Sequence, residues 1–185
     1  DGLWLSERVW EPDLPSTLAR AGIRYTMVDA NQFLPAKAWL PGALQVDDES
    51  FWDLLGSYVT EHAGRSVVLF PASKRLRYWL PFQPVDRTME FLKRLKREEP
   101  FDSPRRGRDS LRANREPVEP GPAAITFADD GEKFGGWPGT ADWVYRRGWF
   151  DSFCDVIDAL RDEGSLRIVS GRDALGEVPC GGLAY

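Results

Sequence analysis

The most regular feature of the hydrophobic pattern is a set of short, nearly continuous apolar runs separated by polar segments. Each run is rich in β-branched or aromatic residues and is bounded by charged or turn-forming residues. Such runs are typical of strands that are covered on both faces. The pattern predicts strands at Ile23 to Asp29, Ser66 to Ala72, Ala123 to Asp129 and Leu166 to Ser170, and Asp1 to Leu5 also resembles a strand interior.

Helical periodicity occupies segments between these runs. Apolar residues recur there at helical spacing, and a glycine follows two of the segments as a stop signal. The predicted helices are Pro12 to Ala21, Pro84 to Arg97 and Asp151 to Glu163. Strands that alternate with helices indicate βαβ units, so we expect an α/β fold with parallel strands.

Acidic residues mark one edge of this predicted sheet. Asp29 ends one strand, and Asp129 and Asp130 stand at the end of another. In parallel α/β folds the active site lies at the carboxyl ends of the strands. A complete eight-stranded barrel needs roughly 250 residues. We therefore interpret the 185 residues as a partial, incomplete TIM-like barrel.

One segment breaks the alternation of strands and helices. Residues 97–121 are charged, contain prolines and are poor in aromatic residues. This composition predicts a mobile insertion loop on the surface. Acidic residues are interspersed among the basic ones, which favours a solvated loop over a binding site for phosphate or nucleic acid.

Composition narrows the classes of function. A hydrophobic share of 42% and a charged share of 29% are typical of a soluble globular protein, and no apolar run is long enough to cross a bilayer. The net charge of −5 speaks against nucleic acid or an anionic membrane as a partner. The chain does not begin with methionine, and we expect it to be a truncated or mature form.

Cysteine and histidine usage adds two expectations. Cys154 and Cys180 lack the spacing of metal ligands, and Cys154 is expected as a buried free thiol on the apolar side of its helix. Free thiols favour a cytoplasmic location. Because His62 is the only histidine, a metal site built from several histidines of this chain is excluded.

Two acidic segments are candidates for catalysis. Glu7 follows an apolar run, lies between Trp4 and Trp10, and precedes a helix that begins with proline. In the second segment the carboxyl groups of Asp129, Asp130 and Glu132 repel one another, which can raise one pKa towards the range of a general acid. A solvated acidic turn with Lys133 as its counter-ion is equally compatible with the spacing.

A pair of acids suits the cleavage of a glycosidic bond. Retaining glycosidases use one carboxylate as nucleophile and a second carboxyl to protonate the leaving oxygen, with the two groups about 5–5.5 Å apart. Acids at the ends of neighbouring parallel strands can meet this spacing. Trp4, Trp10 and Trp137 would then border the sugar, although ordinary packing explains each tryptophan equally well.

Two segments carry a resemblance to a known family. Trp4 to Pro12 and Asp129 to Gly135 resemble two signature regions of glycoside hydrolase family 57. The similarity covers most of the chain outside the insertion and is nearest to the branch of 4-α-glucanotransferases and α-amylases. It continues through Ala21 to Tyr25, Phe70-Pro71, Leu76 to Tyr78, Trp137 to Thr140 and Trp143 to Tyr145.

The resemblance implies a fold, a reaction and residue roles. Glu7 matches the nucleophile and Asp130 the acid/base, while Trp4, Glu132 and Trp137 match positions that line the donor-sugar site. The implied fold is a seven-stranded (β/α) barrel. The implied substrate is an α-1,4-glucan or maltooligosaccharide, converted through a covalent glycosyl-enzyme intermediate without a metal or other cofactor.

The chain departs from the family pattern in places. The family's histidine-containing first motif and the glutamate of its second do not occur, and Asp29 to Phe33 lacks the second aspartate and the histidine that related enzymes carry. Transfer and hydrolysis both stay open. So does a non-catalytic or degenerate α-glucan-binding homologue, and we expect the 185 residues on their own to be inactive. A metal-dependent deacetylase on a similar barrel needs paired histidines, which this chain lacks.

Overall fold

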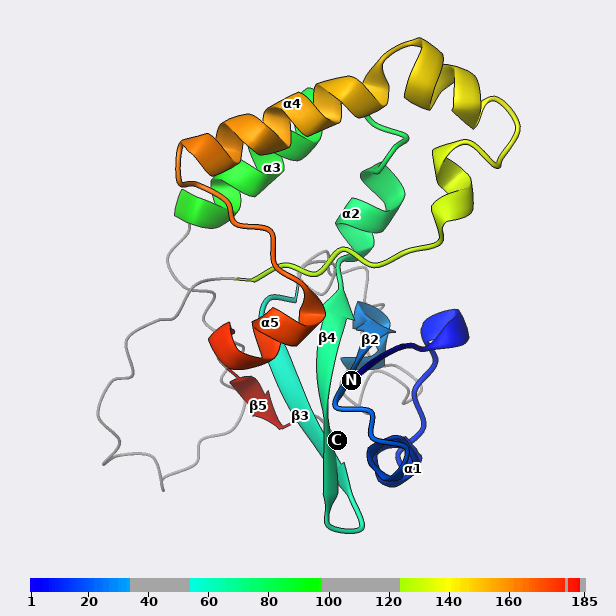
Figure 1. Ribbon diagram of the computed structural model, residues 1–185, viewed down its shortest axis with the longest axis vertical. Coiled ribbons are helices and arrows are strands. Elements are labelled where there is room, and N and C mark those ends of the chain that lie inside the picture. Colours follow the sequence, from blue (N-terminus) through cyan, green and yellow to red (C-terminus); the bar gives the residue numbers. More distant parts are fainter. Residues whose placement is uncertain (34–53, 98–123, 179, 184–185) are drawn as a thin grey trace, which may run out of the picture.

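A five-stranded sheet and a group of helices beside one of its ends form the molecule (Figure 1). The computed structural model describes residues 1–33, 54–97, 124–178 and 180–183. The strand order is β1-β2-β4-β3-β5. The strands are β1 (Gly2–Trp4), β2 (Tyr25–Asp29), β3 (Ser57–His62), β4 (Arg65–Ala72) and β5 (Cys180–Leu183).

The sheet is mixed, so the expectation of parallel strands throughout is wrong. Strand β2 pairs in the parallel sense with both β1 and β4, whereas β3 pairs with β4 in the antiparallel sense. A two-residue turn at Ala63 and Gly64 joins β3 to β4, with φ angles of 51° and 71°. Positive φ at both positions is the geometry that closes a tight hairpin between twisted strands. The hairpin places β3 beside β4 without a crossover helix.

Three predicted strands are confirmed at their centres. Ile23 to Asp29 contains β2, Ser66 to Ala72 lies within β4, and Asp1 to Leu5 contains β1. The apolar runs of β2 and β4 contribute fully buried side chains, with Val28 at 0% and Val67 at 1% exposure, whereas β1 has none and its Trp4 is 38% exposed. Local pattern was sufficient here because these strands lie inside the sheet or pair with its interior.

Two predicted strands are not formed as expected. In Ala123 to Asp129, only Thr126 bridges to the sheet, opposite Ala72, and Ala123 lies outside the described residues. Leu166 to Ser170 is irregular and connects two helices, and Ile168 there is 67% exposed. Its apolar character therefore does not reflect burial in a sheet. The expected insertion at 97–121 falls almost wholly outside the described residues.

The helices lie where periodicity predicted them, with two additions. The predicted helices appear as α1 (Leu14–Arg20), α3 (Val85–Arg97) and α4 (Trp149–Asp162). Two short helices, α2 (Lys74–Trp79) and α5 (Gly171–Glu177), were not predicted. Helix α2 follows β4 directly, and the Ser73 hydroxyl caps it by accepting the Leu76 backbone N–H at 3.2 Å.

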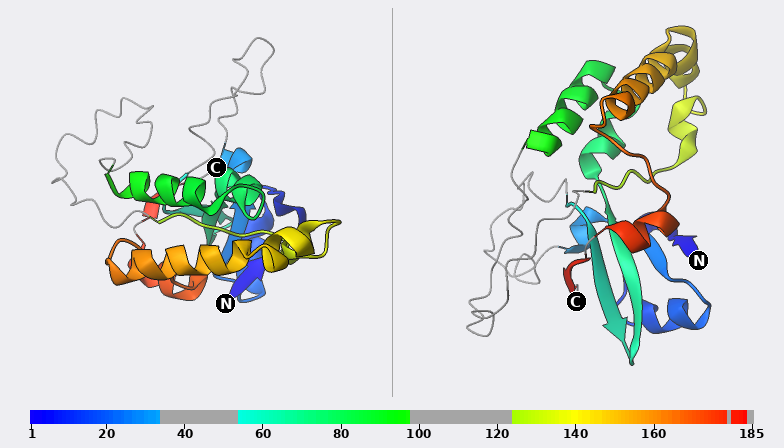
Figure 2. Two further views of the ribbon diagram at one scale, coloured as in Figure 1. Left: turned by 90° about the horizontal axis from the view of Figure 1, so that it is seen from above. Right: turned by 60° about the vertical axis from the view of Figure 1, so that its left-hand side comes forward.

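An apolar core holds the helices at this end of the sheet together. Helices α3 and α4 lie side by side at one end of the sheet, as both sets of views show (Figures 1 and 2). A buried apolar cluster fills the space between these two helices and α2. Its buried members are Leu76, Leu80, Val85, Val144 and Trp149. Partly buried side chains pack around it: Phe91, Ile125, Phe134, Trp143, Phe153 and Val156.

This core predicts a large effect for one substitution. Trp149 is 4% exposed, and its indole N–H donates to the Gln83 carbonyl oxygen at 2.8 Å. Trp149→Ala should therefore lower the free energy of unfolding by about 3–5 kcal/mol, measured by urea denaturation. Ile168→Ala is the control, because this exposed side chain should change stability by less than about 0.5 kcal/mol. Equal effects of the two substitutions would contradict the assigned core.

The environment of Cys154 corrects another expectation. Cys154 lies on α4 with its side chain exposed and outside any disulfide, and Cys180 is likewise exposed and not disulfide-bonded. Phe153 and Val156, one residue before it and two after it, face the helical core instead. The expectation of a buried thiol at Cys154 is therefore wrong. In the part of the chain that the structure describes, no helix is long and apolar enough to span a membrane.

Candidate active site

The carboxyl ends of the parallel strands meet at the edge of the sheet that faces α2 (Figure 1). The register pairs Trp4 at the end of β1 with Met27, and Asp29 at the end of β2 with Ala72. Ala72 in turn bridges to Thr126 in the parallel sense. The segments that follow Trp4 and Thr126 therefore leave the sheet at the same edge. These segments carry the predicted catalytic acids.

Arg77 of α2 joins the end of β2 to the segment that follows the bridge at Thr126. Its guanidinium donates through Nη1 to Asp29 Oδ2 at 2.7 Å, and its Nε lies 3.4 Å from Asp129 Oδ2. The Arg77 side chain is only 13% exposed, so both ion pairs are largely removed from water. Paired, hydrogen-bonded charges avoid most of the penalty that a single buried charge would pay. The segment before Asp130 is thereby attached to β2 and α2.

Lys133 is the most buried charge of the site. Its side chain is 3% exposed, and the ammonium donates to Asp129 Oδ2 and to the Arg77 carbonyl oxygen, each at 2.5 Å. The rings of Phe82, Phe127 and Phe134 surround it, with their centroids 5.4–5.9 Å from Nζ. A cation over aromatic faces gains further electrostatic attraction.

The charge pairing sets the protonation of this cluster. Burial by itself raises the pKa of Asp129, but hydrogen bonds from Lys133 and the Asp130 amide, with the charges of Lys133 and Arg77, lower that pKa below its usual value. Burial lowers the pKa of the Lys133 ammonium, and its hydrogen bond to Asp129 opposes this only in part. Carboxyl crowding therefore does not raise the pKa of Asp129. Asp129 is an ionised, structural carboxylate.

The lowered pKa of Asp129 predicts a pH-dependent term in stability. Since the folded chain binds this proton less readily than the unfolded chain, the carboxylate stabilises the fold above its ordinary pKa of 3.8. That stabilisation is lost as the pH falls further. Asp129→Asn should therefore unfold more easily than the wild type at pH 7, and the difference should shrink below about pH 4. Urea denaturation over a pH series measures it.

The control for this pH series is Asp158→Asn. Asp158 forms an exposed pair with Arg161 at 2.7 Å, which contributes little in water. Asp158→Asn should therefore have nearly the same free energy of unfolding as the wild type at every pH. A difference between Asp129→Asn and wild type that stays constant from pH 7 to pH 2 would rule out the ionised carboxylate as the cause.

Glu7 stands in an unusual backbone conformation just beyond β1. Glu7 and Arg8 both have positive φ angles, 58° and 56°, within the short turn Ser6–Arg8. Residues with a Cβ adopt this region at an energetic cost, and such residues cluster at active sites. The Glu7 side chain is exposed. The turn therefore presents a carboxylate to solvent at the edge of the sheet.

Arg8 connects the two candidate acids. Its guanidinium lies 5.4 Å from the centroid of the Trp4 ring and places Nη1 3.6 Å from Asp130 Oδ2. The Arg8 side chain is 14% exposed, whereas that of Asp130 is 50% exposed. The residue next to Glu7 thus contacts the carboxylate of Asp130. The segments predicted to carry nucleophile and acid/base are brought together.

The predicted sugar-binding residues are exposed to solvent to different degrees. Trp4 is 38% exposed, and Trp137 is 47% exposed and stacks on Phe82 with centroids 5.8 Å apart. Glu132 is exposed in the short helix Gly131–Phe134, and its carbonyl oxygen accepts the backbone N–H of Trp137 at 3.1 Å. Trp10 is half-buried. Trp4 and Trp137 therefore offer accessible ring surface, and Trp10 offers less.

Two arginines of the site were missing from the predicted set. Arg8 directly follows Glu7, and Arg77 lies in one of the segments that resemble the family. Neither position shows from spacing alone which carboxylate it pairs with. For Lys133 the signal was present, because a lysine four residues after Asp129 can reach that carboxylate within one short turn.

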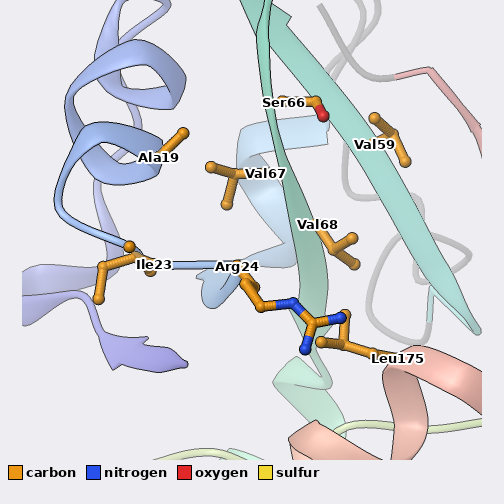
Figure 3. A pocket seen from close by; sticks show the side chains of 9 residues that line it. Ala19, Ile23, Arg24, Val59, Ser66, Val67, Val68 and Leu175 are labelled. Carbon is orange, nitrogen blue, oxygen red and sulfur yellow. The ribbon is translucent and has the colours of Figure 1, made fainter.

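A hollow at the other end of the sheet does not share this chemistry (Figure 3). It encloses about 390 Å³ and lies near Arg24, which precedes β2, and Ser66, at the start of β4. Arg24 is the only charged residue among those that line it. The hollow therefore lies at the amino ends of the strands, away from the acidic edge. Within the described ranges, no three His, Cys, Asp or Glu side chains gather as metal ligands would.

Comparison with known proteins identifies the family of this chain. The profile of glycosyl hydrolase family 57 matches residues 1–179. The chain belongs to glycosyl hydrolase family 57. Within this family it is 34% identical over 184 residues to a 4-alpha-glucanotransferase of Thermococcus litoralis, covering 100% of this chain and 23% of that protein. An alpha-amylase of Pyrococcus horikoshii is 39% identical over 85% of this chain and 20% of its own length.

The family relationship extends to the fold. The crystal structure of the Thermococcus litoralis 4-alpha-glucanotransferase superposes with a TM-score of 0.71 at 35% identity. That match covers 100% of this family 57 chain and 23% of the other chain. The chain thus spans about a fifth to a quarter of the length of these relatives.

Proposed function

We propose that this chain supplies the catalytic carboxyls of a retaining enzyme that acts on α-1,4-glucans, as a 4-α-glucanotransferase or an α-amylase. The observation that carries the proposal is the contact of Arg8 with Asp130, which brings the segment of Glu7 against that of Asp130. The names of the family relatives support the substrate class. Because the chain spans only a fraction of those relatives, the activity is that of the full-length protein.

The proposed reaction has two steps. In the first, the Glu7 carboxylate attacks the anomeric carbon while Asp130 donates its proton to the departing glycosidic oxygen. In the second, Asp130 as carboxylate removes a proton from water or from an acceptor sugar hydroxyl, and that oxygen displaces Glu7. Water yields hydrolysis, and the acceptor sugar yields transfer. The carboxyl proton that leaves Asp130 in the first step is restored in the second.

The exposed aromatic side chains fit the proposed substrate. Trp4 stands next to Glu7's turn, and Trp137 follows Glu132 on the loop of Asp130. Flat rings stack on the apolar faces of sugar rings. We assign Trp4, Trp137 and Glu132 to the donor-sugar site and Trp10 to its border. The half-buried position of Trp10 agrees with a supporting role.

The fold proposed for the full-length protein is a (β/α)7 barrel. Strands β1, β2 and β4 and the bridge at Thr126 succeed one another with their carboxyl ends on one edge, as barrel strands do. In this proposal they are a partial barrel, and the antiparallel β3 with β5 is an addition to it. The superposition on the glucanotransferase supports this placement.

Trapping the intermediate tests the function. A maltosyl fluoride with an added fluorine on its donor ring forms a glycosyl-enzyme that breaks down slowly, because the fluorine destabilises the oxocarbenium-like transition state. After digestion, mass spectrometry should find the label on the peptide that contains Glu7. A label on another carboxylate would overturn the assignment of the nucleophile. Absence of label, together with glucan binding, would indicate a non-catalytic homologue.

A further inference from the structure

The segment Asp129–Lys133 contains a chain of contacts that ends on the backbone of Asp130. Asp129 Oδ1 accepts the Asp130 backbone N–H at 2.9 Å, and Asp129 Oδ2 accepts the Lys133 ammonium at 2.5 Å. One carboxylate therefore holds the peptide of the proposed acid/base with one oxygen and is itself held through the other. The orientation of Asp130 depends on where the Asp129 carboxylate is fixed.

Lys133 has little freedom to move. Its ammonium also donates to the carbonyl oxygen of Arg77, in α2, and three phenylalanine rings enclose it. At 3% exposure it has almost no contact with water. Lys133 thus attaches Asp129 to α2, an element 56 residues away in the chain.

Arg77 does not duplicate this contact. Its Nε lies 3.4 Å from Asp129, whereas its Nη1 is held at 2.7 Å by Asp29. The shorter and better buried partner of Asp129 is Lys133. The Asp130 side chain is half exposed, and its contact with Arg8 is longer, at 3.6 Å. The 2.9 Å hydrogen bond from the Asp130 backbone N–H to Asp129 is therefore shorter than the side-chain contact with Arg8 and holds the acid/base more closely.

We propose that Lys133 is a positioning residue for the acid/base, acting through the carboxylate of Asp129 on the backbone of Asp130. This inference rests on the proposed function. Lys133 does not touch the substrate, because it is enclosed beneath the loop. Its role is to keep the Asp130 carboxyl in line with the glycosidic oxygen during proton transfer.

Leaving-group dependence tests the role. Maltoheptaose has a sugar leaving group that needs Asp130's proton, whereas fluoride leaves from α-maltosyl fluoride with little help. In the full-length protein, Lys133→Met should lower kcat/KM for maltoheptaose by about 10²-fold, the cost of a misplaced catalytic group. For the fluoride, kcat/KM, which reports only the first step, should stay within about threefold of wild type. Lys93→Met on α3 is the control and should change neither value.

A second variant keeps the test valid if Lys133→Met folds poorly. Removing the ammonium leaves the Asp129 charge buried without its main partner, which is destabilising. In the double variant Lys133→Met/Asp129→Asn neither charge remains, so the melting temperature should recover towards that of the wild type. The loss of kcat/KM should still be larger for maltoheptaose than for α-maltosyl fluoride, because the asparagine is no longer fixed to α2. Wild-type turnover of maltoheptaose by this double variant would overturn the positioning role.

The remaining outcomes separate this inference from the proposed function. Equal losses on both substrates in Lys133→Met, with a wild-type melting temperature, would mean that Lys133 supports the whole site rather than the acid step. That result overturns the inference alone, provided that Glu7→Gln is inactive on both substrates. Full activity of Glu7→Gln would overturn the proposed function, and the inference with it.

Discussion

Replacing Glu7 by glutamine is expected to reduce turnover of maltoheptaose in the full-length protein by roughly 10⁴- to 10⁶-fold. The amide has the shape of the carboxylate but cannot form the covalent glycosyl-enzyme. Glu7 is exposed at the turn beyond β1, so the change should leave the folded state intact. Release of reducing sugar and of longer oligosaccharides measures hydrolysis and transfer, and a thermal melt verifies the fold.

Glu11→Gln provides a matched control for Glu7→Gln. Glu11 lies four residues further along the same segment and is also exposed, but it has no assigned role. It should retain wild-type turnover. If Glu7→Gln kept wild-type activity, Glu7 would not be the nucleophile. If both variants were inactive, the segment as a whole rather than one carboxylate would be responsible.

Asp130→Asn should reduce activity by a different mechanism from Glu7→Gln. Loss of the general acid is expected to lower kcat/KM for maltoheptaose by about 10²- to 10⁴-fold, because the sugar leaving group needs a proton. With α-maltosyl fluoride the first step should survive, and the second should be slow for want of a base. Added azide, which needs no base, should restore turnover and yield a maltosyl azide, detected by mass spectrometry.

The fold of Asp130→Asn is expected to be close to that of wild type. The Arg8 contact is 3.6 Å long and the Asp130 side chain is half exposed, so the pair contributes at most about 1 kcal/mol. Asp155→Asn is the control. Asp155 is an exposed aspartate of α4, and this variant should have wild-type activity without azide. Azide-independent wild-type activity of Asp130→Asn would assign the acid/base to another residue.

The assigned roles explain why the two neighbouring aspartates differ. Asp129 is 10% exposed and faces Lys133 and Arg77, which keep it ionised, whereas Asp130 is half exposed and faces the turn of Glu7. A carboxylate held by two buried cations is a poor proton donor. The structure therefore favours Asp130 over Asp129 for the proposed proton transfer, in agreement with the resemblance to the family.

Part of the site was predictable because it depends on local pattern. A continuous apolar run such as the one in β4 is stable in a sheet only when both of its faces are covered. A charged residue at the end of such a run, as Asp29 is at the end of β2, marks the point where the chain leaves the sheet. Parallel strands share one carboxyl edge, so the clustering of Asp29 and Asp129 followed from their positions alone. The family motifs added the roles of Glu7 and Asp130, which remain proposals.

What the sequence by itself determined is therefore the apolar strands β1, β2 and β4, the amphipathic helices α3 and α4, and the edge that carries the acids. Tertiary structure alone decided that β3 turns back on β4, that Leu166 to Ser170 is no strand, and that Cys154 is exposed. It also decided the charge pairs, since Arg77 meets Asp29 across 48 residues. The physical reason is that burial and ion pairing depend on groups distant in the chain, whereas periodicity depends only on neighbours.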